Sequence, residues 1–168
     1  MPTPITITLG PKADPQVVSE FTRTVLKSIL RKAGLPSALI TSTARTPAQQ
    51  ARVMFDNIQT HGVAHQKALY AAAGDQVIDV FVALEAQGKT PAEIKAGMEQ
   101  KILEVGPSKV SRHLADPKVL NVVDVAPSSI ANKAAFRQAV RDETRVNKFL
   151  APPQDPAYHL EIPQPANG

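Results

Sequence analysis

The sequence contains no cysteine and no tryptophan, and aromatic residues make up only 4% of its 168 residues. Without cysteine the chain cannot form disulfides, thiolate metal sites or a cysteine nucleophile. Any metal site must therefore be built from histidine, aspartate and glutamate. The few aromatic rings offer little on which bases could stack, and the basic residues are scattered. We therefore expect no nucleic-acid partner, in spite of a net charge of +4.

Long apolar runs are also missing. No stretch approaches the roughly 20 apolar residues of a membrane-spanning helix, so we expect no integral membrane segment. The N-terminal stretch MPTPITITLGPKADP has no basic start followed by an apolar core, which predicts that no signal peptide is present and that the chain is made in the cytoplasm. The length and the 43% hydrophobic content predict one globular domain over residues 1–168, with an N-terminal arm over 1–14 and a flexible tail over 163–168.

Helix start and stop signals divide most of the chain. Capping residues followed by proline, and closing glycines, predict helices over residues 14–34, 46–62 and 90–106. A helix over 65–88 is expected to break near Gly74 and restart at Asp75, and a helix over 129–147 is expected to be capped by Ser128 or Ser129. Stretches rich in β-formers predict strands over 37–45, 119–126 and 157–162, and ITITL near the N-terminus is a strand or an arm. Helices before clustered strands indicate an α+β fold.

Two short stretches carry the unusual residues. In SRHLADPKVLNVVDVAP, residues 111–127, His113 precedes a turn and Asp124 lies inside an apolar strand-like run. A carboxylate in such a run is costly unless it meets a cation, hydrogen-bond donors or a metal. His159 lies in a later apolar run, AYHLEIP. These three residues offer two imidazoles and one carboxylate, the donor set of a catalytic zinc site with one position left for water.

The remaining histidines and the neighbouring acid have several interpretations. In a strand, residues two apart share a face, so Glu161 points the same way as His159. Glu161 could orient that ligand, act as a general base, or be an exposed acid on an edge strand. His61 and His65 are four apart, but Gly62 interrupts the helix between them, which disfavours a metal pair.

An arginine lies where a predicted strand meets a capped helix. Arg45 ends the strand over 37–45, and the helix begins at once with Thr46. A guanidinium at such a junction can reach a cleft and bind a carboxylate through two parallel hydrogen bonds. The alternative is a surface arginine paired with a nearby acid.

The order of these motifs resembles the zinc D,D-peptidases of bacterial cell walls: the VanX/VanY-like and phage L-alanyl-D-glutamate endopeptidase group, often called M15 peptidases. That group has Ser-Gly-Tyr-Arg-Ser/Thr between a strand and a Gln-bearing helix, matched here by STARTPAQQ at 42–50. It continues with Ser-x-His-x-x-Gly-x-Ala-x-Asp, whose start is matched by SRH at 111–113 and whose end is matched by Asp124. A late strand with histidine is matched by YHLEI at 158–162. The resemblance covers residues 37–162.

The resemblance implies a small antiparallel sheet that carries a metal site and packs against several helices, in the manner of D,D-peptidase and Hedgehog-like folds. It implies a Zn²⁺ ion held by His113, Asp124 and His159. The implied activity is a metallopeptidase that hydrolyses peptidoglycan stem peptides or cross-links with an activated water. Two imidazoles and a carboxylate would also suit iron or manganese.

The other site residues follow from the same resemblance. Asp155 or Glu161 would accept the proton of the attacking water and return it to the leaving amine. Arg45 would bind a substrate carboxylate or the developing oxyanion, with Gln50 supporting it from the helix. Ser111 would position the neighbouring histidine or touch the substrate.

This chain departs from the group's pattern in two places. The spacing between His113 and Asp124 is longer, which makes Asp116 a rival for the third ligand position. The group's catalytic acid stands three residues before the last histidine, and Pro156 occupies that position here. A non-catalytic metal-binding or wall-binding module of the same fold is therefore the alternative function, and a helical adaptor with coincidental motifs is a third.

Delivery to the cell wall needs an external route if no signal is present. The resemblance offers two routes, a phage endolysin that leaves through membrane holes or an antibacterial effector injected by a secretion machine. Either would act in the periplasm or on the cell wall. An injected effector would be expected to have an immunity protein that blocks its site.

Overall fold

The computed structural model describes residues 4–166 of the chain. These residues form two compact units. The sheet unit comprises the described residues up to Ala44 and those from Asp116 onward, and the helical unit comprises Arg45–Ala115. Each unit has its own cluster of buried hydrophobic side chains. The single peptidase-like domain over residues 1–168 stays a prediction.

The sheet unit is built on five strands in the order β1-β2-β3-β5-β4. Their bounds are β1 Thr6–Leu9, β2 Ser37–Ser42, β3 Leu120–Val125, β4 Lys148–Leu150 and β5 Tyr158–Pro163. The pairs β2–β3, β3–β5 and β4–β5 are antiparallel, but β1 pairs with β2 in parallel. The sheet is therefore mixed, which corrects the expectation of a purely antiparallel sheet. The α+β class is confirmed.

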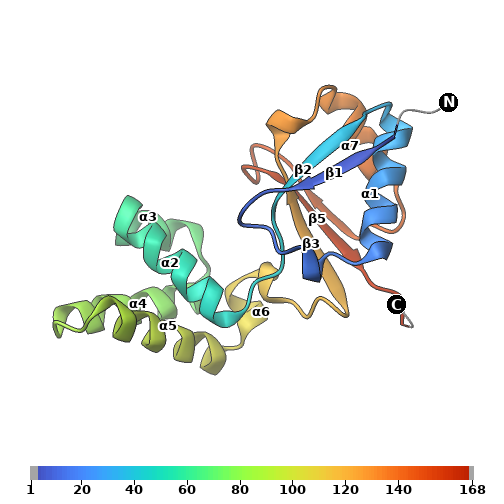
Figure 1. Cartoon of the computed structure of the whole chain (residues 1–168). Coiled ribbons are helices and arrows are strands. Elements are labelled where there is room, and N and C mark those ends of the chain that lie inside the picture. The colour runs from blue at the N-terminus through green and yellow to red at the C-terminus, as the bar shows by residue number, and fades with distance from the viewer. Residues whose placement is uncertain (1–3, 167–168) are drawn as a thin grey trace. The chain divides into compact units, whose positions relative to one another are not determined.

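One face of this sheet is covered by α1 (Glu20–Ala33) and α7 (Lys133–Asp142), which pack against each other (Figure 1). Side chains alternate between the faces of a strand, so Val123, Val125 and Leu160 point into this core. Asp124 and His159 lie between these positions and point to the opposite face. The alternation of β3 and β5 thus separates the apolar core from the polar face of the sheet.

Two helix starts in this unit differ from the prediction. Asp14 caps only the short 3-10 turn Pro15–Val17, and α1 begins after Ser19, whose hydroxyl accepts the amide of Thr22. The last helix, α7, begins after Asn132 instead of Ser128 or Ser129, because the residues Pro127–Ser129 form another 3-10 turn. Both errors came from capping residues that close a turn without starting a helix.

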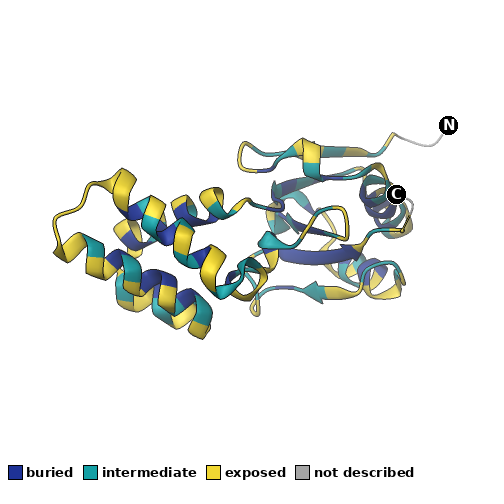
Figure 2. Ribbon diagram, turned by 90° about the horizontal axis from the view of Figure 1, so that it is seen from below, coloured by how far each residue is buried: buried dark blue, intermediate teal, exposed yellow. Residues whose placement is uncertain are grey.

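The helical unit contains α2 Pro47–His61, α3 Val63–Leu69, α4 Ala72–Ala86, α5 Pro91–Val105 and α6 Pro107–Val110. In Figure 2 the buried positions recur along one side of these helices, as an amphipathic pattern requires. Thr46 and Thr90 cap α2 and α5 as predicted, and Thr46 forms a full capping box with Gln49. None of the helices in the described part of the chain is long and apolar enough to cross a membrane.

The helix is broken as predicted, but the break lies a few residues before Gly74. The chain leaves the helical conformation at Tyr70 and Ala71, and α4 runs through Gly74. Gly74 serves packing instead, because a Cβ at this position would lie 2.5 Å from the ring of Tyr70. The glycine therefore gives the aromatic ring room to lie against α4.

Candidate metal centre

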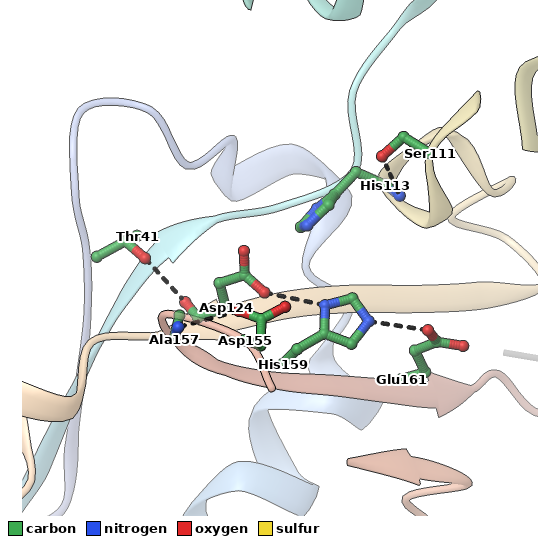
Figure 3. Close-up of polar contacts among 8 residues, drawn as sticks. All are labelled: Thr41, Ser111, His113, Asp124, Asp155, Ala157, His159 and Glu161. Carbon is green, nitrogen blue, oxygen red and sulfur yellow. Dashed lines mark hydrogen bonds and ion pairs between the residues drawn. The ribbon is translucent and has the colours of Figure 1, made fainter. Parts of the chain in front are cut away.

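The register between β3 and β5 places the first two candidate ligands. Asp124 is paired directly with His159, so their side chains leave the same face of the sheet side by side. One carboxylate oxygen of Asp124, Oδ1, lies 3.1 Å from Nδ1 of His159 (Figure 3). Thr41 in the neighbouring strand donates to the backbone carbonyl of Asp124 at 3.3 Å. The strand-like carboxylate that the sequence indicated therefore has an imidazole partner.

Glu161 binds the other nitrogen of the same ring. Its Oε2 lies 2.8 Å from Nε2 of His159, and the Glu161 side chain is only 1% exposed (Figure 3). Burial alone would lower the pKa of His159, but the hydrogen bonds and charges of Asp124 and Glu161 outweigh this and raise the pKa above its ordinary value. The sandwich of two carboxylates thus fixes the orientation of the imidazole. Glu161 is not an exposed acid on an edge strand.

The third candidate ligand comes from the end of the helical unit. His113 is in the 3-10 turn Arg112–Leu114, which Ser111 caps: the Ser111 hydroxyl accepts the backbone N–H of His113 at 3.2 Å. Ser111 therefore positions this histidine through its backbone. The carbonyl of His113 in turn accepts the backbone N–H of Arg45 at 2.7 Å.

One potential ligand atom from each of His113, Asp124 and His159 lies within 4.8 Å of the others, so this group could hold a metal ion. All three side chains are shielded from solvent to a large extent, with His113 at 9% and His159 at 5% exposure. The rival Asp116 is exposed, and its carboxylate accepts the amide of Lys118 at 2.9 Å in the turn before β3. Among the described residues, Asp124 and not Asp116 belongs to the group.

The donor set is one that a divalent metal ion accepts, zinc among them. Asp124 Oδ1 and His159 Nδ1 lie 3.1 Å apart as hydrogen-bond partners, and a metal ion bound by both would replace that hydrogen bond. Metal-bound histidines commonly donate their second N–H to a carboxylate, and Glu161 is in that position on Nε2. The acid beyond the ligand is thus the partner that a metal-binding imidazole requires.

Asp155, the other candidate base, lies in the turn before β5. The backbone N–H of Ala157 donates to one of its carboxylate oxygens at 2.9 Å, and the side chain is half-buried (Figure 3). Pro156, in the position of the group's catalytic acid, is exposed in the same turn. The two candidate bases therefore differ clearly: Glu161 is buried against His159, whereas Asp155 is a turn residue.

Arg45 and Gln50 meet as the sequence suggested. Nη1 of Arg45 donates to Oε1 of Gln50 at 3.2 Å, and Gln50 is completely buried although it is polar. The amide nitrogen of Gln50 donates to the hydroxyl of Tyr70 at 3.2 Å. Sequence reasoning missed Tyr70. The available signal was Gly74, four residues later on the next helix, which was interpreted as a break.

Comparisons of the chain with protein-family models, with curated proteins and with solved structures found no match. The likeness to the D,D-peptidase group therefore depends on the residues quoted above, and the function must be argued from the candidate centre itself.

Proposed function

We propose that the protein is a zinc-dependent peptidase of the D,D-peptidase type that hydrolyses peptidoglycan stem peptides or cross-links. The observation that carries the proposal is the group of His113, Asp124 and His159, together with the buried Glu161 on the far nitrogen of His159. A carboxylate in this position suits a metal-binding imidazole. It accepts the hydrogen bond of the Nε2–H group, and the tautomer that results has no proton on Nδ1, which can then bind a metal. The phage-endolysin and injected-effector routes belong to this proposal.

Each residue then has a defined task. A zinc ion bound by the three ligands would polarise the scissile carbonyl and lower the pKa of the attacking water. Glu161 holds the imidazole of His159, and Ser111 holds the backbone of His113. Asp155 is the better candidate for the general base, because Glu161 already binds the far side of the imidazole ring. Arg45 supplies a guanidinium for a substrate carboxylate or for the oxyanion.

The deciding experiment measures metal content. Wild type and the variants His113→Ala, Asp124→Ala and His159→Ala are purified without added metal, reconstituted with zinc, and subjected to elemental analysis. We expect about one zinc per chain in wild type and loss of that zinc in each variant, since removal of one ligand of three greatly weakens binding. His65→Ala is the matched control, because His65 is not in the group and its ring centre lies 5.1 Å from that of His61.

A hydrolysis assay then separates the peptidase from the alternative module. Wild-type protein loaded with zinc is incubated with peptidoglycan fragments, and new amino and carboxyl termini are identified by mass spectrometry. Cleavage that disappears with the metal supports the peptidase. Bound zinc without cleavage would favour the non-catalytic module, for which Pro156 in place of the group's acid is the specific argument. Folded wild type that binds no zinc would reject the peptidase and the metal-binding module, and would leave a wall-binding module without metal or a helical adaptor.

A further inference from the structure

The two long helices of the sheet unit carry a strong excess of positive charge. Together α1 and α7 contain seven basic and two acidic side chains, a net charge of +5, although the whole chain has a net charge of only +4. The two helices are far apart in the sequence but pack against each other over one face of the sheet (Figure 1). The fold therefore gathers basic residues that are scattered along the sequence.

On each of these helices the basic residues recur at every fourth position. They are Arg23, Lys27 and Arg31 in α1, and Lys133, Arg137 and Arg141 in α7. Residues four apart lie on the same side of a helix, so each helix presents a line of three cations with a repeat of about 6 Å. Four of the six side chains are exposed and two are half-buried. These six residues are named the basic face.

The acids near the basic face pair with other cations. Asp142 lies 3.2 Å from Lys32, and Glu143 forms its ion pair with Arg145. The four exposed cations of the basic face have no acid within ion-pair distance among the described residues. Their charge is therefore available to a partner.

An ordinary exposed helix has mixed charges, and α5 of the same chain is an example. It carries three glutamates and two lysines, with Lys101 lying 3.0 Å from Glu104. Like charges four residues apart repel each other and destabilise a helix, whereas opposite charges stabilise it. The two lines of cations thus reduce the stability of α1 and α7. This cost favours an anionic partner over a surface that is merely solvated.

The side chains of α1 and α7 indicate the chemistry of that partner. Four of the six cations are arginines, which bind phosphate oxygens through two parallel hydrogen bonds. The aromatic rings of the two helices, Phe21 and Phe136, pack in the hydrophobic core, so none is presented for stacking on sugars or bases. Two lines on neighbouring helices spread the charge in two directions, as a plane of phosphate headgroups does.

We propose that the basic face binds anionic phospholipid headgroups and holds the sheet unit against a negatively charged bilayer surface. The binding is electrostatic, because none of the large exposed hydrophobic side chains of the described residues belongs to α1 or α7. Asp124 and His159 point to the opposite face of the sheet, so the lipid would leave their side uncovered. The inference does not depend on a bound metal or on peptidase activity.

The test measures binding of the full chain to vesicles by co-sedimentation. One set of vesicles is phosphatidylcholine alone, and the other is an equal mixture of phosphatidylcholine and phosphatidylglycerol. We expect binding to the mixed vesicles only. That binding should be lost when the salt concentration is raised from about 0.1 M to about 1 M, because the Debye length falls from about 10 Å to about 3 Å.

Two variants remove charge from the two helices separately. Arg23→Gln/Lys27→Gln/Arg31→Gln should weaken binding to the mixed vesicles on the order of 100-fold, since each cation near an anionic surface contributes about fivefold. Lys133→Gln/Arg141→Gln should weaken it about 30-fold for the same reason. Loss in both variants is required, because both helices belong to the basic face.

Arg137 is left in place because it also has a structural role. Its Nη2 donates to the carbonyl of Pro152 at 3.3 Å, and its guanidinium lies 5.6 Å from the centre of the Tyr158 ring. Circular dichroism and thermal unfolding establish that the variants are folded. The α1 variant should be no less stable than wild type, since it loses the repulsion between like charges.

A third variant removes the same charge from another part of the chain. Lys89→Gln/Lys101→Gln/Lys109→Gln lowers the net charge by three, like the α1 variant, but its positions are in the helical unit. It should bind the mixed vesicles about as tightly as wild type, because salt confines the attraction to charges close to the lipid. Equal weakening in this control would show that net charge, and not the basic face, is responsible.

The outcomes decide between the bilayer and other polyanions. Binding to mixed vesicles that both helix variants lose and the control retains supports the inference. Folded wild type that ignores the mixed vesicles at the lower salt concentration would overturn it. Duplex DNA is added as a competitor at equal phosphate concentration. Release of the protein from the vesicles by that DNA would also overturn the inference, and would assign the basic face to nucleic acid.

Discussion

At the scale of single residues, the two acids beside the candidate centre should have different roles. Glu161→Gln removes the negative charge from Nε2 of His159, so zinc affinity should fall about 10- to 100-fold, the usual cost of losing such a partner. Asp155→Asn should retain zinc but lower hydrolysis about 100-fold or more, as expected for loss of a general base. Zinc affinity from competition with a chelator, and kcat from peptide hydrolysis, check the two expectations.

The contrary result is equally specific. If Glu161→Gln binds zinc as tightly as wild type and loses hydrolysis, Glu161 is the base and the role of Asp155 is structural. Asn at position 155 can still accept the amide of Ala157, so the turn before β5 should be retained in that variant. A change in thermal unfolding of Asp155→Asn would show that the turn, and not the chemistry, was affected.

Sequence reasoning could find the candidate ligands because they are polar, ionisable residues in or beside apolar runs. A carboxylate in NVVDV and a histidine in AYHLEI needed partners, and the structure groups Asp124 and His159 with His113. It could not choose between Asp116 and Asp124, since that choice depends on the register of β3 against β5. It also could not find Tyr70, because its hydrogen bond to Gln50 joins α2 to the junction between α3 and α4, a contact between segments far apart in the sequence.

At the scale of elements, an ion pair between Glu143 and Arg145 stabilises the end of α7. Glu143 stands at the C-terminal cap, where the helix dipole disfavours a negative charge. Arg145 compensates by donating from Nε and Nη2 to the two carboxylate oxygens at 2.8 and 2.7 Å. These hydrogen bonds hold the pKa of Glu143 below its ordinary value. The ion pair therefore stabilises the folded protein only while Glu143 is ionised.

The sign of the pH dependence follows from that lowered pKa. The contribution of Glu143 is complete above the pKa of an unfolded glutamate, about 4.3, and is lost as the pH falls through the lower folded value. Glu143→Gln should therefore lose less stability than wild type between about pH 5 and pH 3. Urea unfolding at several pH values measures this. The double variant Glu143→Gln/Arg145→Gln should have the same slope as Glu143→Gln, and a steeper slope would contradict the assignment to this pair.

The helices that the sequence predicted well are those whose start and stop signals agree with the apolar period between them. For α2 and α5, a threonine cap is followed by proline, a long apolar period and a closing glycine. At Asp14 and Ser129 a capping residue was present, but it belongs to a 3-10 turn, and α1 and α7 begin at the later caps Ser19 and Asn132. The strand β4 was missed because its three residues are too few to show an alternation of apolar and polar side chains. It is recognised as a strand only by its pairing with β5.

At the scale of the whole molecule, the two hydrophobic clusters indicate that folding is divided between the units. The cluster of the helical unit contains residues from α2, α4 and α5, with Met54, Ile78 and Met98 fully or almost fully buried. The cluster of the sheet unit draws on α1, α7 and the strands. Neither cluster includes residues of the other unit. A unit with its own core and short helix connections meets the usual requirements for folding alone.

We therefore expect a fragment of residues 45–115 to fold without the rest of the chain. It keeps the capping threonines and closing glycines of α2 and α5, and α4 and α5 approach closely at Gly97, where a Cβ would lie 2.5 Å from Leu84. A core of this size supports only about 3–5 kcal/mol, so the fragment should unfold cooperatively at lower urea than the full chain. Far-ultraviolet circular dichroism and urea titration measure both properties. A fragment without helical signal would show that its core depends on the sheet unit, which would make the whole chain one cooperative unit in spite of its two clusters.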